Sequence, residues 1–158
     1  MAAVPGSLLI RRALNEDTPR RDLVTSGPAP AFQLETTDGV TVSSADFAGR
    51  PAIVHFFGSW CEPCREGIPV LAAALRRHAN LAMVGVIVRD DPAEAYRVAR
   101  EAGITWPLLV DPDEEVARAW GVDSAPVTFF VSGEGRISGQ LVGQLSLLLV
   151  DRQLDRIL

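Results

Sequence analysis

Two cysteines separated by two residues stand between an apolar run and a helical pattern, and this arrangement constrains the fold more than any other feature. Residues 52–57 read AIVHFF, an apolar, β-rich run with the length of a buried strand. The motif WCEPC follows at residues 60–64, and Ile68, Leu71 and Leu75 then recur at helical spacing. Proline suits the first turn of a helix, where its missing N–H costs nothing. The sequence therefore predicts a strand, a cysteine pair and a helix in immediate succession.

The cysteine pair has the spacing that thiol–disulfide exchange requires. At the start of a helix, residues i and i+3 lie on one face, so Cys61 and Cys64 are within bridging reach. The partial positive charge and free N–H groups of a helix N-terminus favour the thiolate of Cys61. Cys64, one turn further in, is predicted to resolve the mixed disulfide. Pro63 stiffens the turn, and the negative charge of Glu62 opposes thiolate formation, which predicts a reducing couple.

Other uses of two cysteines fit the sequence less well. A disulfide between residues three apart closes too small a loop to stabilise the fold much. A zinc site needs about four ligands, and only His55 and His78 could complete one. His78 would lie roughly 20 Å from Cys64 along the same helix. We expect no metal and no cofactor.

The whole chain has the length and composition of one globular domain. It has 158 residues and a formal net charge of −5, which provides no basic surface for nucleic acid and no polybasic membrane anchor. We expect a loose N-terminal tail over residues 1–27, a single domain over 28–158, and a monomer. No apolar stretch reaches membrane-spanning length and no signal peptide is recognisable, which favours the cytoplasm if Met1 is the true start.

The remaining pattern predicts a mixed α/β sheet covered by helices on both faces. An Asp38-Gly39 turn predicts an N-terminal β-hairpin. Further strands are expected at 81–88, 107–110, 127–131 and 136–142, and further helices after Pro92, over 113–120 and from Ser146. The last helix is expected to bury Leu147, Val150, Leu154 and Ile157.

The stretch from Ile53 to Arg65, IVHFFGSWCEPCR, resembles the thioredoxin superfamily, in the branch typified by TlpA, ResA and CcmG/DsbE. The hairpin, the inserted helix and strand, and the stretch GVDSAP at 121–126 extend the resemblance over most of residues 28–158. It implies a thioredoxin-like fold and a cis-Pro126 packed against the disulfide. The substrate-binding residues that we expect are Trp60, Glu62, Pro63, Ala125 and Pro126.

The resemblance also implies a biological setting. Its members reduce protein disulfides, often those of apocytochrome c before haem attachment, with electrons from a membrane thiol transporter. It implies an extracytoplasmic location, periplasmic or membrane-anchored, in contrast to the cytoplasmic expectation.

A proton carrier for Cys64 is less obvious from the sequence. Cytochrome-maturation members carry glutamates at the positions of Gly67 and Val127, and Glu66 should face another direction. Thioredoxin keeps a buried aspartate at the position of His55. We therefore predict that His55 carries the proton for Cys64, because an imidazole with a pKa near 6.5 suits that task. A buried histidine that is hydrogen-bonded to the backbone and has no catalytic role is the alternative.

Two rival functions remain for a chain of this kind. A peroxiredoxin-like peroxidase shares the fold, but its threonine three residues before the reactive cysteine is absent: Gly58 and Cys61 stand at the two candidate positions. A non-catalytic thioredoxin-like binding module is the other alternative, although such modules commonly lose one cysteine and this chain keeps both.

Overall fold

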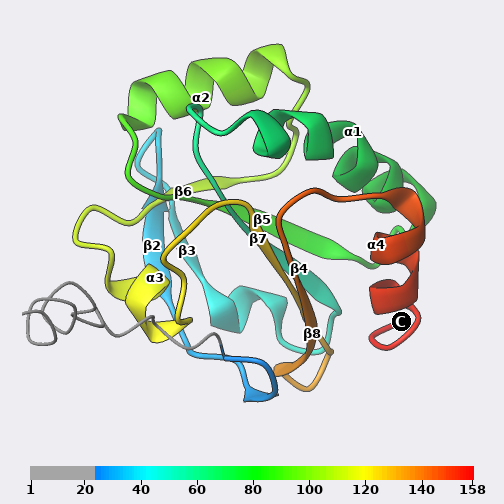
Figure 1. The fold of residues 1–158 in the computed structure, drawn as a ribbon. Coiled ribbons are helices and arrows are strands. Elements are labelled where there is room, and N and C mark those ends of the chain that lie inside the picture. The colour runs from blue at the N-terminus through cyan, green and yellow to red at the C-terminus, as the bar shows by residue number, and fades with distance from the viewer. Residues whose placement is uncertain (1–23) are drawn as a thin grey trace, which may run out of the picture.

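The computed structural model describes residues 24–158 and is built on one eight-stranded sheet in the order β1-β8-β7-β4-β5-β6-β2-β3 (Figure 1). The strands are β1 (Gly27–Pro28), β2 (Gln33–Thr36), β3 (Thr41–Ser43), β4 (Ala52–Phe57), β5 (Ala82–Ile87), β6 (Leu108–Val110), β7 (Val127–Val131) and β8 (Arg136–Val142). β4 runs parallel to β5 and antiparallel to β7. The predicted mixed sheet is confirmed.

Within residues 24–158, four α-helices and one short 3-10 helix accompany the sheet. They are η1 (Ser44–Phe47), α1 (Glu62–Arg77), α2 (Pro92–Glu101), α3 (Glu115–Ala119) and α4 (Leu147–Leu154). The helices α1, α2 and α4 cover one face, and α3 lies on the other (Figure 1). Among residues 24–158, no helix is both long and apolar enough to cross a membrane.

The central strand β4 divides its side chains between two hydrophobic cores. All six of its residues are buried, and successive side chains point to opposite faces. Ile53 and Phe57 enter the core beneath α1, α2 and α4, whereas Val54 and Phe56 enter the core beneath α3. The cysteine pair belongs to the first of these cores.

Most predicted elements are confirmed, including the hairpin of β2 and β3 and the bounds of β4, β7 and β8. The predicted burial was wrong for one residue of the last helix pattern: Leu147 is 51% exposed. Val150, Leu154 and Ile157 are buried as expected. Leu145, just before the helix, is buried instead.

The expected tail over residues 1–27 lies mostly outside the described residues. Its last part is described and lies against the sheet. The N–H of Val24 donates to the carbonyl of Trp120 over 3.3 Å, and Gly27 begins β1, which pairs with β8.

Candidate active site

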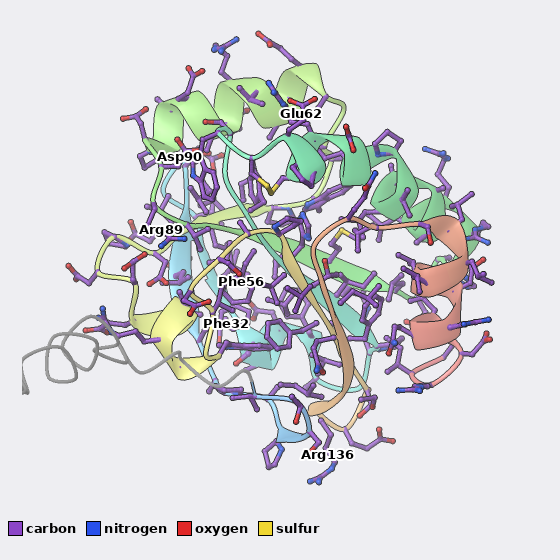
Figure 2. The ribbon with its side chains drawn as sticks, in the orientation of Figure 1. Phe32, Phe56, Glu62, Arg89, Asp90 and Arg136 are labelled. Carbon is purple, nitrogen blue, oxygen red and sulfur yellow. A yellow bond between two sulfur atoms is a disulfide. The ribbon has the colours of Figure 1, made fainter. Side chains whose placement is uncertain are left out.

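The cysteine pair lies at the N-terminus of α1, as the sequence predicts (Figure 2). Cys61 is the N-cap residue, and Cys64 is the third residue of the helix. The two form a disulfide with a Cα–Cα distance of 5.2 Å. The backbone N–H of Cys64 donates to Cys61 Sγ over 3.2 Å. The same N–H group would stabilise negative charge on this sulfur after reduction, which favours the Cys61 thiolate.

Both cysteines are buried in the oxidised protein. Cys61 is 4% exposed and Cys64 is 1% exposed, so both are buried and Cys64 is the deeper one. Both pack in the same apolar core as Phe57 and Ile68. Cys64 must therefore lose its proton in dry surroundings.

The two residues between the cysteines face solvent. Glu62 and Pro63 are both exposed, and both fall in the first turn of α1. The carboxylate of Glu62 forms an ion pair with Arg65. The expected opposition of Glu62 to the thiolate is therefore partly offset by the charge of Arg65.

Trp60 stands at the surface immediately before the cysteine pair. It is 52% exposed, so burial alone does not explain a tryptophan at this position. Its Nε1–H donates to the carbonyl of Val88 over 3.3 Å, and the guanidinium carbon of Arg89 lies 5.9 Å from the centre of its ring. By contrast Trp106 and Trp120 are buried, as expected for packing residues.

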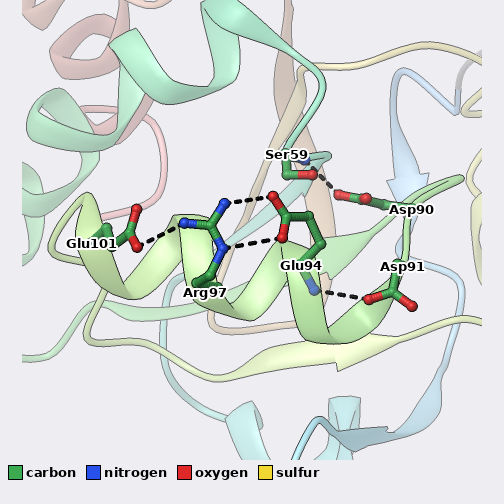
Figure 3. Close-up of polar contacts among 6 residues, drawn as sticks. All are labelled: Ser59, Asp90, Asp91, Glu94, Arg97 and Glu101. Carbon is green, nitrogen blue, oxygen red and sulfur yellow. Dashed lines mark hydrogen bonds and ion pairs between the residues drawn. The ribbon is translucent and has the colours of Figure 1, made fainter.

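Two residues that the sequence analysis did not identify hold the motif from the end of β5. Asp90 accepts a hydrogen bond from the backbone N–H of Ser59 over 2.6 Å (Figure 3). Arg89 contacts Trp60 and also donates to the carbonyl of Asp123 over 2.8 Å. Because β4 and β5 are parallel neighbours, their carboxyl ends meet at one edge of the sheet, and that rule was the signal that could have found these residues.

The Ala125–Pro126 peptide bond is cis, as the resemblance implied. Val127, the next residue, pairs with Phe56 at the end of β4, so Pro126 lies at the same end of the sheet as the cysteine motif. The Pro126 carbonyl accepts from the N–H of Gly143, and Ala125 packs against the core that contains both cysteines.

Glycine occupies position 67, where the resemblance implied that family members carry a glutamate. Gly67 is buried on α1, and a β-carbon added to it would lie 3.2 Å from Cδ1 of Leu145. Leu145 belongs to the core of the cysteine pair. Glu66 is exposed and accepts a hydrogen bond from Gln144, so it faces away from the pair's core as predicted.

His55 lies in the middle of β4 and is almost completely buried. Its side chain shares a sheet face with Ile53 and Phe57, and its ring stacks on Phe57 with centroids 6.0 Å apart. Nδ1 lies 2.9 Å from Thr128 Oγ1, and Nε2 has no hydrogen-bond partner among residues 24–158. Burial lowers the pKa of His55 from 6.5 to about 4. The imidazole is therefore neutral at neutral pH, which weakens the pKa argument made from the sequence.

Comparison with known proteins agrees with this geometry. A family model described as "AhpC/TSA family" matches residues 25–140. The thiol:disulfide interchange protein DsbE of Xylella fastidiosa is 30% identical over 147 residues, covering 90% of this chain and 74% of its own. HelX of Rhodobacter capsulatus, also a thiol:disulfide interchange protein, is 29% identical over 161 residues, covering 100% and 90%.

A solved structure extends the agreement to three dimensions. The crystal structure of a thiol:disulfide interchange protein of the thioredoxin family from Chlorobium tepidum TLS is 30% identical, covers 86% of this chain and 98% of its own, and gives a TM-score of 0.74. The thioredoxin-like fold is thereby confirmed. The chain belongs to the AhpC/TSA family, among the thioredoxin-fold thiol–disulfide oxidoreductases of the ResA and DsbE type.

Proposed function

We propose that this protein reduces disulfide bonds in other proteins through the dithiol form of Cys61 and Cys64. The observation that carries the proposal is the position of Cys61: its sulfur caps a helix and accepts the N–H of Cys64. A half-exposed aromatic ring at Trp60 stands directly before it. This combination provides an activated thiolate with a contact surface beside it.

The reaction proceeds in two exchange steps that together transfer two electrons. The Cys61 thiolate attacks one sulfur of the substrate disulfide, forming a mixed disulfide and releasing a substrate thiolate that takes up a proton. Cys64 then loses its proton and attacks Cys61 Sγ. The mixed disulfide breaks, the second substrate sulfur leaves as a thiol after protonation, and the Cys61–Cys64 disulfide remains. A dithiol donor must then reduce the pair again.

We propose that His55 accepts the proton that Cys64 loses in the second exchange step. Two observations support this assignment: His55 lies on the sheet face that carries the core of both cysteines, and its Nε2 has no partner among the described residues. In the tautomer that donates from Nδ1–H to Thr128 Oγ1, the neutral imidazole can accept a proton at Nε2. Because burial lowers the pKa of His55 to about 4, the imidazolium would be short-lived and would have to pass the proton on.

The substrate and donor are proposed from the family. Apocytochrome c is the first substrate to test, a membrane thiol transporter is the donor, and the site of action is extracytoplasmic. The monomer acts alone on its substrate. Trp60, Glu62, Pro63, Ala125 and Pro126 are proposed to contact the substrate polypeptide, because they surround the cysteine pair in sequence or at the same end of the sheet.

Reduction of insulin, followed by turbidity with dithiothreitol as donor, tests this function. We expect catalysed precipitation by the wild-type protein and none by Cys61→Ser. Consumption of hydrogen peroxide is measured alongside, because the peroxidase alternative shares the fold. Peroxide consumption without insulin reduction would favour the peroxidase, and the absence of both activities would favour a binding module.

A further inference from the structure

Arg89 contacts two loops that meet at the cysteine end of the sheet. We call residues 58–61 the motif loop and residues 121–126 the proline loop. The guanidinium of Arg89 lies 5.9 Å from the ring centre of Trp60 in the motif loop. The same guanidinium donates from Nη2 to the carbonyl of Asp123 in the proline loop over 2.8 Å. One side chain therefore connects both loops.

The backbone and the charge of Arg89 both indicate that this contact is specific. Its φ is +46°, in the left-handed region that residues other than glycine rarely adopt. Arg65, Arg77 and Arg97 form ion pairs with carboxylates, but within residues 24–158 Arg89 forms none, although Asp90 is its neighbour. Asp90 bonds instead to the N–H of Ser59. The guanidinium thus remains directed at the aromatic ring and the carbonyl.

We propose that Arg89 is a positioning residue that fixes the separation of the motif loop and the proline loop for a polypeptide substrate. This inference rests on the proposed reduction of protein disulfides. A polypeptide bonded to Cys61 must extend past Trp60 and toward Pro126, so its binding depends on both loops at once. A small disulfide needs access only to Cys61. Arg89 therefore affects protein substrates and not small ones.

Four substitutions of Arg89 distinguish the effect of losing its side chain from the effect of its strained backbone. Arg89→Gly removes the side chain and suits the positive φ, whereas Arg89→Ala removes it and keeps the strain. Arg89→Lys keeps a cation that can reach the ring and the carbonyl, and Arg89→Gln keeps a donor for the carbonyl without the charge. Arg156→Ala is the matched control, since Arg156 also donates to a backbone carbonyl, that of Ser138 on β8.

The experiment measures kcat and KM for insulin and for hydroxyethyl disulfide in each variant. For Arg89→Gly and Arg89→Ala we expect KM for insulin to rise about fivefold or more, with kcat nearly unchanged. The ratio of kcat/KM for insulin to kcat/KM for hydroxyethyl disulfide should therefore fall by about fivefold or more. Arg89→Lys should restore most of the ratio, Arg89→Gln should restore little, and Arg156→Ala should match the wild type. An unchanged ratio in Arg89→Gly would overturn the proposal.

A second measurement does not depend on activity. Trp60 is half-exposed and the other two tryptophans are buried, so acrylamide quenching reports chiefly on Trp60. Quenching should increase in Arg89→Gly and not in Arg156→Ala. Equal quenching in all three proteins would contradict the proposal that Arg89 holds the Trp60 ring in place. If the wild type reduces neither disulfide, the proposed function fails by itself, and the quenching result still decides whether Arg89 holds Trp60.

Discussion

Leu145 packs against Gly67 so closely that a β-carbon on Gly67 would lie 3.2 Å from Leu145 Cδ1. Gly67→Glu should therefore destabilise the protein by about 2–3 kcal/mol, because it crowds Leu145 and buries a carboxylate. Urea unfolding measures this loss. In the double variant with Leu145→Ala, the added loss from Gly67→Glu should be smaller by about 1 kcal/mol. Full stability of Gly67→Glu would show that Leu145 does not restrict the position. Glu66→Ala, at an exposed site, is the control.

Cys61 and Cys64 should respond differently to substitution by serine. Cys61→Ser should lower insulin reduction by at least about 100-fold, because the capping sulfur is the nucleophile. Cys64→Ser should accumulate a mixed disulfide between Cys61 and the substrate, since nothing resolves it. Mass spectrometry of the trapped complex, with and without reductant, identifies the bonded cysteine. A mixed disulfide formed through Cys64 in the Cys61→Ser protein would reverse the two roles.

The stability of the folded protein should fall in acid because of His55. Its pKa is about 4 when folded and about 6.5 when unfolded, so the unfolded chain binds the extra proton between these values. The free energy of unfolding should therefore decrease as pH falls below about 6.5, by about 2 kcal/mol between pH 7 and pH 4.5. Urea unfolding of His55→Asn, which has no such group, should lack this part of the decrease. Equal pH slopes in both proteins would mean that His55 ionises freely when folded.

His55 should also affect the second exchange step. In a single turnover, His55→Asn should release the second substrate thiol about tenfold more slowly than the wild type near pH 7. The difference should shrink as the pH rises, because hydroxide can then take the proton of Cys64 in place of His55. Quenched-flow trapping of the mixed disulfide measures the step. If the two pH profiles coincide in shape and rate, His55 only packs.

The fold and the cysteine pair could be predicted because their signals are local. The apolar run of β4 and the helical spacing of α1 lie within about 25 residues of sequence and define the site between them. The prediction for Leu147 failed because helical spacing alone did not show that Leu145, outside the helix, fills the adjoining space beside Gly67. Periodicity describes a helix face and not the loop before it.

Arg89 and Asp90 were missed for a different reason. Their partners Trp60, Asp123 and Ser59 are about 30 residues away in sequence, and the contacts form because β4 lies between β5 and β7 in the sheet. The cis bond at Pro126 was recognised from family resemblance and not from its own local pattern. Contacts between loops at one end of a sheet depend on strand order, so the rule for parallel neighbours could have found them only once the pairing of β4 with β5 was known.

The position of β4 in the sheet has a consequence for how activity is lost. β4 has hydrogen-bonded strands on both sides, whereas β1 and β3 lie at the edges. Amide hydrogens of β4 should exchange with deuterium only through global unfolding, while those at the edges exchange through local opening. A cysteine pair joined to such a strand keeps its geometry until the whole domain unfolds cooperatively. On heating, redox activity and tertiary structure should therefore disappear in a single transition.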